Sequence, residues 1–316
     1  MSYDESQPAP RRRFGLNPLT LTVAALVPAA VVGVLVWQGL GGSGDDGGNA
    51  AAATSSASPT GRSGTLLGDG VPGDSEPGGS GPASPGATDP AKGPLAGKVV
   101  VIDPGHNTRN HLHTAEINKQ VQIGPTSKEC DTTGTATNAG YAEAAFTLDV
   151  SHRLRDLLKK EGATVTLTQD DDRPFGPCVD ERARIGNRAK ADAVVSVHAD
   201  GSAVGNRGFH VILPGLVKGG GADTTPIVGP SRDLGEHIAG RFAAVTGSAP
   251  ANYIGDGTGL DVRKDLGGLN LSTVPKVFVE CGNMRDPKDA ALLTSADWRQ
   301  KAARGLAEGI SGFLAP

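Results

Sequence analysis

Residues 98–106 read KVVVIDPGH, a short apolar run rich in β-branched residues that becomes polar at Pro-Gly-His. Two later stretches have the same form, with AVVSVHAD at 193–200 and KVFVECGN at 276–283. Short apolar runs of this kind are typical of strands buried on both faces of a sheet. We therefore predict strands at 98–103, 193–197 and 276–279, each with a polar residue at or just past its end.

The sequence between and beyond these runs alternates helix and strand signals. Residues 142–160 carry apolar side chains at helical spacing and are followed by Gly162, a residue type that often caps helices. Strands that alternate with helices favour a mostly parallel sheet. The predicted fold is α/β, with a single mostly parallel twisted sheet and helices on both faces. The remaining elements are predicted strands at 164–168 and 208–213 and predicted helices at 179–189, 231–245 and 297–313.

Four side chains suited to metal binding or proton transfer stand at the ends of these predicted elements. His106 follows the first strand, His198 ends the third, Glu280 ends the last, and Glu143 opens the first helix. In open α/β sheets, sites form beyond the carboxyl ends of the strands. This fold would therefore bring residues that are far apart in the sequence to one rim.

The residue types at this rim predict a metal-dependent hydrolase. Two imidazoles and a carboxylate are a common ligand set for catalytic zinc, which keeps a fourth position for water and lowers its pKa towards about 7. A further carboxylate is then needed to move the proton to the leaving nitrogen. Each residue also has a structural alternative: a turn residue for His106, a favourable helix N-terminal charge for Glu143, a core histidine for His198 and an arginine partner for Glu280.

Other polar residues of this region have simpler interpretations. We interpret His111, His113 and His152 as exposed side chains, because they lie in a polar segment or on the outer face of a predicted helix. Arg182 and Asn187 are interpreted as structural pairing partners. The net charge of −4 gives no basis for nucleic-acid binding, since phosphate neutralisation needs a basic face.

The first 95 residues have a different character. Three arginines at 11–13 precede a mostly apolar stretch at 19–40, which is long enough to cross a hydrocarbon core of about 30 Å. Positive charge stays on the cytoplasmic side, so the rest of the chain is expected outside the cytoplasmic membrane, either anchored or released. The expected parts are a cytoplasmic basic segment at 1–15, a transmembrane signal-anchor or signal peptide at 16–40, a disordered Gly/Ser/Pro/Ala-rich linker at 41–95 and a catalytic domain at 96–316.

Three cysteines allow one disulfide bond and one free thiol. Disulfides persist outside the cytoplasm. We predict a Cys130–Cys178 bond because both residues lie in polar loops, whereas Cys281 follows a buried strand.

Four stretches that occur in order resemble the zinc-dependent N-acetylmuramoyl-L-alanine amidases, and most closely the AmiC-type cell-wall amidases of actinobacteria. The resemblance covers about 95–313 and rests on residues 98–106, the helix start at Glu143, residues 181–200 and residues 274–284. It implies hydrolysis of the amide between N-acetylmuramic acid and L-alanine of peptidoglycan stem peptides, in cell-wall remodelling or daughter-cell separation. It also implies one zinc ion per catalytic domain, with ligands His106, Glu143 and His198 and the catalytic residue Glu280.

The sequence departs from this family in two places. Residues 108–140 are long and polar where many members have a short Gly-rich loop, and Cys281 stands where many carry Thr or Ser. Two alternatives remain: a catalytically inactive peptidoglycan-binding module, and a different zinc hydrolase such as a peptidase of the cell wall. The expected partners are peptidoglycan and, through the N-terminal segment, the cytoplasmic membrane. The sequence does not identify a protein regulator.

Overall fold

The structure, a computed structural model, describes residues 93–315. The predicted basic segment, membrane segment and most of the linker lie outside the described residues. Between residues 93 and 315, no helix is both long enough and apolar enough to cross a membrane. Leu95, which was assigned to the linker, is fully buried, and its backbone N–H donates to the carbonyl of Glu161. The packed domain therefore includes residues before the expected boundary at 96.

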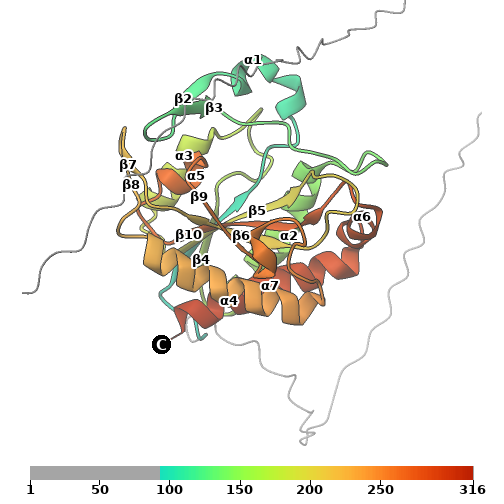
Figure 1. The fold of residues 1–316 in the computed structure, drawn as a ribbon. Coiled ribbons are helices and arrows are strands. Elements are labelled where there is room, and N and C mark those ends of the chain that lie inside the picture. The colour runs from blue at the N-terminus through green and yellow to red at the C-terminus, as the bar shows by residue number, and fades with distance from the viewer. Residues whose placement is uncertain (1–92, 316) are drawn as a thin grey trace, which may run out of the picture. The chain divides into compact units, whose positions relative to one another are not determined.

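A six-stranded sheet lies at the centre of this domain (Figure 1). Four neighbouring strands are parallel, the fifth runs antiparallel to the fourth, and the last pairs in parallel with the fifth. The prediction of an α/β fold with a mostly parallel sheet is confirmed. In spatial order the strands are β4 (Thr164–Leu167), β1 (Val99–Pro104), β5 (Ala193–Asp200), β10 (Lys276–Asn283), β6 (His210–Pro214) and β9 (Leu260–Arg263).

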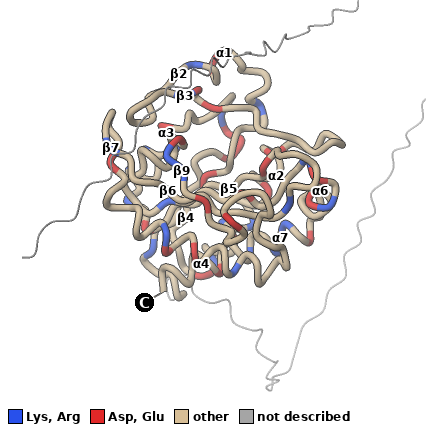
Figure 2. The backbone as a smooth tube through the Cα atoms, in the orientation of Figure 1, with Lys and Arg blue, Asp and Glu red and all other residues tan. Residues whose placement is uncertain are grey.

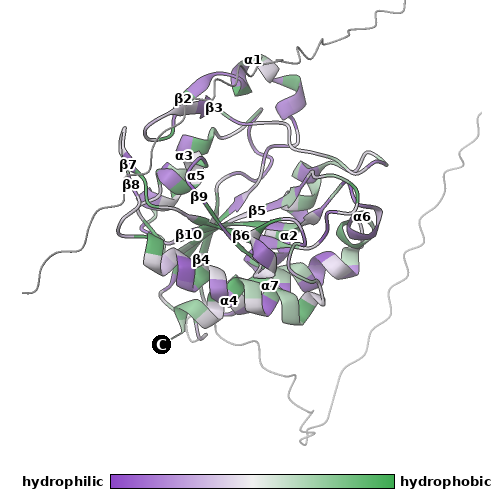
Figure 3. Cartoon of the chain, in the orientation of Figure 1, coloured by the Kyte–Doolittle hydropathy of each residue, from purple (hydrophilic) through white to green (hydrophobic). Residues whose placement is uncertain are grey.

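One face of the sheet carries the main hydrophobic core. Helices α2 (Glu143–Lys160), α4 (Val228–Thr246) and α7 (Ala296–Leu314) cover this face. Alternate residues of β10, including Val277 and Val279, are buried in this core. Figure 3 shows the central strands as hydrophobic and the helices as mixed, as expected for helices with one face toward solvent.

The opposite face of the sheet is polar near the carboxyl ends of the strands. Because successive side chains alternate between faces, Phe278 and Glu280 lie on this face, as do Ser196 and His198 of β5. The elements above it are α3 (Val179–Arg188), α5 (Gly267–Asn270) and the segment after β1, which contains η2 (Asn110–Leu112), α1 (Thr114–Ile117), β2 (Gln120–Gln122) and β3 (Ser127–Glu129).

Two predicted strand ends were wrong for the same reason. β5 and β10 continue past residues 197 and 279 to Asp200 and Asn283, so His198 and Glu280 lie within strands rather than at their ends. The sequence becomes polar there because this end of the sheet lines a cavity instead of the core. Elements that the sequence analysis did not predict include β9, α5, β7 (Lys218–Gly219), β8 (Ala222–Asp223), η3 (Gly255–Gly257) and α6 (Pro287–Leu293).

The segment after β1 is attached to α3 by a disulfide bond. Cys130 and Cys178 form this bond, with their Cα atoms 4.2 Å apart. The backbone N–H of Val179 also donates to the carbonyl of Cys130. Cys281 is a buried free cysteine. The long polar segment is therefore fixed to the start of α3, beside the predicted site.

Candidate metal centre

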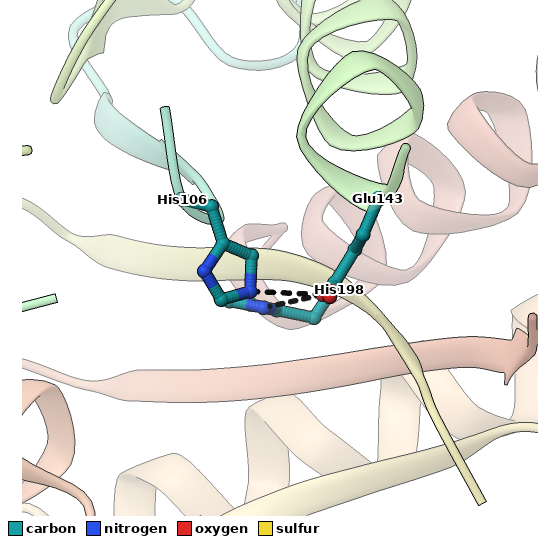
Figure 4. Close-up of side chains that lie close together, drawn as sticks. All are labelled: His106, Glu143 and His198. Atoms are coloured by element: carbon teal, nitrogen blue, oxygen red, sulfur yellow. Dashed lines mark hydrogen bonds and ion pairs between the residues drawn. The ribbon is translucent and has the colours of Figure 1, made fainter. Parts of the chain in front are cut away.

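His106, Glu143 and His198 come together from three different elements (Figure 4). His106 lies just past β1, Glu143 is the first residue of α2, and His198 lies in β5. Glu143 Oε1 is 3.2 Å from His106 Nε2 and 2.9 Å from His198 Nδ1. The three donor atoms lie within 4.8 Å of one another. Two imidazoles and one carboxylate that converge in this way fit zinc, which proteins bind at about 2 Å from such atoms.

His106 is held with one ring nitrogen turned toward Glu143. Its Nδ1 lies 3.1 Å from the carbonyl oxygen of Thr132. Because a carbonyl only accepts hydrogen bonds, Nδ1 carries a proton, which leaves Nε2 as the nitrogen that can bind a metal once it has lost its own proton. The backbone of His106 has a φ of +60°, a conformation that is uncommon for residues other than glycine. The surrounding contacts therefore hold this residue in position.

The carboxylate of Glu143 is fixed by two backbone N–H groups. Thr135 donates to Oε2 at 2.9 Å, and Ala199 donates to Oε1 at 3.2 Å. The ring of His198 stacks on Phe278, with centroids 3.8 Å apart and planes 14° apart. These contacts between protein groups orient the donor atoms, as partners around metal ligands typically do.

His106 and Glu143 also stabilise each other's charged forms electrostatically. Burial disfavours the charged form of His106, but Glu143 and Asp131 outweigh burial and raise the pKa of His106 to about 10. Burial likewise opposes ionisation of Glu143, yet the two histidines hold the pKa of Glu143 well below its usual range. Burial lowers the pKa of His198. A metal must displace the proton from His106, so metal affinity should rise with pH.

Glu280 lines the same cavity as these three residues. The cavity has a volume of about 320 Å³. Among residues 93–315, no hydrogen-bond partner reaches the buried Oε2 atom of Glu280. Burial, with contributions from Glu143 and Asp200, raises the pKa of Glu280 well above its ordinary value. The structure therefore does not support the alternative of an arginine partner, and it leaves a carboxyl group available at the cavity wall.

A buried charge network supports the loop that carries His106. Arg182 pairs with Asp103 at 2.8 Å and with Asp131 at 2.9 Å, and it donates to the carbonyl of His106 at 2.9 Å. Lys276 reaches the other carboxylate oxygen of Asp103 at 3.0 Å. Figure 2 shows acidic and basic residues close together along α3, the helix that supplies Arg182. The sequence interpretation of Arg182 as a pairing partner is correct, although its two partners were not identified.

We expect Arg182→Met to destabilise the domain by about 3–5 kcal/mol, because it leaves buried Asp131 without its arginine partner and buried Asp103 with Lys276 as its one remaining cation. Arg184→Met is the matched control: Arg184 lies in the same helix with its side chain 53% exposed, and exposed pairs contribute about 0–1 kcal/mol. Urea unfolding of both variants measures the difference. Equal stability of the two variants would show that the network contributes little.

The same network sets a pH dependence. Burial opposes the ionisation of Asp131, but Arg182 and His106 outweigh burial and lower the pKa of Asp131 to about 2. Burial also opposes the ionisation of Asp103, yet Lys276 and Arg182 hold the pKa of Asp103 well below its usual range. The stability that these ionised carboxylates contribute is fully present above about pH 4, and it is lost as the pH falls through their pKa values in the folded state. The difference in the free energy of unfolding between wild type and Arg182→Met should therefore become smaller at acidic pH.

Two glycines allow the close approach of the metal-binding side chains. A Cβ atom at Gly105 would lie 2.2 Å from Cε1 of His198, and one at Gly134 would lie 2.7 Å from Cδ2 of His106. Gly134 also has a φ of +73°, which disfavours other residues. The backbone fixes the position of a Cβ atom, so the new methyl group could not move away from either histidine ring.

Gly105→Ala is expected to displace the ring of His198 and to weaken metal binding about 10–100-fold, as typically follows when support around a ligand is lost. Gly240→Ala in α4 is the control, since a Cβ there meets no atom within 4 Å. Competition titration with a chelator measures both affinities. Unchanged affinity in Gly105→Ala would mean that the loop adjusts without moving His198.

The remaining candidates lie away from this cluster. His111 is exposed, His113 packs against Phe175, and His152 is half exposed and hydrogen-bonds to Asp170. The prediction that His113 and His152 are simply exposed is therefore incomplete, because each of them contacts another side chain. Asn187 donates to the carbonyl of Leu271 and accepts from the N–H of Thr273, in agreement with its structural interpretation.

Comparisons with known proteins match the packed domain. Residues 100–312 match a family model described as N-acetylmuramoyl-L-alanine amidase. The chain is 43% identical over 226 residues to the N-acetylmuramoyl-L-alanine amidase Rv3717 of Mycobacterium tuberculosis, which covers 70% of this chain and 88% of that protein. The crystal structure of the N-acetylmuramyl-L-alanine amidase Ami1 from Mycobacterium smegmatis is similar with a TM-score of 0.64 and 42% identity, over 70% of this chain and 98% of Ami1. The amidase AmiC2 of Nostoc punctiforme, at 21% identity, a TM-score of 0.52 and coverage of 70% of this chain and 99% of AmiC2, shares the fold.

Proposed function

Because this chain belongs to the N-acetylmuramoyl-L-alanine amidase family, we propose that His106, Glu143 and His198 hold one zinc ion and that Glu280 is its catalytic residue. The chain is a hydrolase that acts on an amide bond, and the bond is the one between N-acetylmuramic acid and L-alanine of the peptidoglycan stem. The observation that carries the assignment of residues is the convergence of three donor atoms within 4.8 Å, in a cavity that Glu280 also lines.

Zinc bound at this site supplies a Lewis acid that activates water for attack on the amide carbonyl. Glu280 takes the proton from the attacking water and passes it to the leaving nitrogen, which departs as the free amino group of L-alanine. A raised pKa suits this double role, because the same carboxyl group must accept a proton and then release it. Glu143 is unsuited to this step because its two oxygens already accept backbone hydrogen bonds and face the histidines.

We further propose that the enzyme acts outside the cytoplasmic membrane. The apolar stretch at 19–40 and the arginines before it support an anchor or a signal peptide. The Cys130–Cys178 bond is consistent with an oxidising compartment. If residues 16–40 remain in the membrane, the Gly-rich stretch between them and residue 93 would give a reach of about 40 Å by coil statistics, so the enzyme would act on cell wall near the membrane.

The nature of the products tests the proposed reaction. Purified full-length protein with zinc should convert muropeptides into a free glycan and a stem peptide with an N-terminal L-alanine, as detected by mass spectrometry. A peptidase would instead leave L-alanine attached to the sugar and shorten the stem. An inactive binding module would leave the muropeptides unchanged.

A further inference from the structure

Two buried polar atoms on neighbouring strands have no hydrogen-bond partner among residues 93–315. One is Oε2 of Glu280 in β10, and the other is Nδ1 of His210 in β6. His210 is only 3% exposed, and the other residues of β6 are Val, Ile, Leu and Pro, all of them buried. A buried nitrogen without a partner costs free energy, so its presence in this apolar strand needs an explanation.

The register of the sheet places these two residues side by side. Glu280 is the direct partner of His210 in the antiparallel pair of β10 and β6. On its other side, Glu280 is the direct partner of His198 in β5. Residues in direct register project from the same face, and their Cβ atoms in an antiparallel pair lie about 4.5–5.5 Å apart. Glu280 therefore lies between a proposed zinc ligand and a second histidine.

Among the described residues, no neighbour of His210 hydrogen-bonds to its Nδ1 atom. Tyr253 meets the ring of His210 edge-on at 6.0 Å, and the hydroxyl of Tyr253 donates to Asp200 at 2.5 Å. The other charged groups near His210 are Asp261 and Arg263. Burial lowers the pKa of His210, which favours the neutral ring. A neutral imidazole has one N–H donor and one acceptor nitrogen, so it can hold a carboxylate by a hydrogen bond.

We propose that His210 is a positioning residue for Glu280 in the amidase reaction. Its Nδ1–H group donates to the carboxylate of Glu280 and holds that side chain toward the attacking water. Catalytic hydrogen bonds are often long in structures without substrate and shorten when substrate binds. The proposal rests on the function proposed above, because it requires Glu280 to act as the base.

Kinetics of three variants test this role. His210→Leu removes the donor and should lower kcat about 10–100-fold, since a hydrogen bond to a charged group contributes at this level. KM and zinc content should stay near wild type. His210→Asn places an amide N–H close to the position of Nδ1 and should restore most of the lost kcat. His237→Leu is the control, because His237 is exposed on α4, far in sequence from the site residues, and its ring hydrogen-bonds to the carbonyl of Asp233 in the same helix.

A double-variant cycle separates positioning from a purely structural role. In a Glu280→Gln background, His210→Leu should cause no further loss of kcat, because the group that it positions is already inactive. If His210→Leu does not fold, the same cycle with His210→Gln, which places its amide further from the backbone than Nδ1, replaces it.

Three results would overturn the proposal: a normal kcat in His210→Leu, no recovery in His210→Asn, or a full additional loss in the Glu280→Gln background. Failure of the proposed function itself would look different. In that case the wild-type protein would release no N-terminal L-alanine at all, whereas failure of this inference alone leaves the wild type active.

Discussion

Glu280→Gln is expected to keep its zinc and to lose about 10²–10⁴-fold in kcat, the range typical of general acid–base groups. Glutamine has nearly the same shape but cannot accept a proton. Because the described structure gives Oε2 of Glu280 no hydrogen-bond partner, the substitution breaks no contact at that atom. It also removes a buried carboxyl group whose ionisation is opposed by its surroundings. The loss should therefore appear in turnover and not in stability.

Three measurements on Glu280→Gln separate these effects: zinc content by elemental analysis, stability by thermal unfolding, and the rate of L-alanine release from muropeptides. Glu308→Gln is a suitable control, because Glu308 lies in α7 with its side chain 41% exposed. A variant with full zinc and near-normal turnover would rule out Glu280 as the proton carrier.

His106→Ala is expected to lose zinc and activity together. His106 supplies one of only three donor atoms in the cluster, and its loss leaves the carboxylate of Glu143 with a single histidine neighbour. A metal that binds only the folded state stabilises it in proportion to the logarithm of its concentration over Kd. Added zinc should therefore raise the Tm of the wild type and leave the Tm of His106→Ala almost unchanged.

His111→Ala is the control for this experiment, since His111 is exposed and outside the cluster. It should bind zinc and hydrolyse muropeptides as the wild type does. Full zinc occupancy in His106→Ala would contradict the assignment of His106 as a ligand.

The apolar runs that were predicted as strands are found as strands, because residues buried on both sides leave a clear pattern in the sequence. His106, Glu143, His198 and Glu280 could be predicted as site residues because polar side chains of these types stand where an apolar run becomes polar or where a helix begins. The distances between these side chains could not be predicted from the sequence, because they depend on the order of the strands in the sheet. β9 (Leu260–Arg263) was missed because an edge strand with the sequence LDVR has too few apolar residues to be distinguished from a loop.

The sequence indicated only part of the buried charge network around Asp103. Asp103 stands in an otherwise apolar strand, and this was a signal that it has a buried cation as partner. Its partners Arg182 and Lys276 are 79 and 173 residues away, so the sequence alone did not identify them. His210 gave no signal at all, because a single histidine in GFHVILP is consistent with an ordinary core position.

The bond between Cys130 and Cys178 closes a covalent ring whose ends are 48 positions apart in the chain. Glu143 and the whole of α2 belong to this ring, as do the exposed residues at 170–172. A protease that cuts the chain once at that exposed loop opens the ring without releasing a fragment. His106 and Glu143 then lie on one fragment and His198 on the other, and the disulfide keeps the two fragments joined, so a nicked chain still holds all three proposed zinc ligands in one covalent molecule.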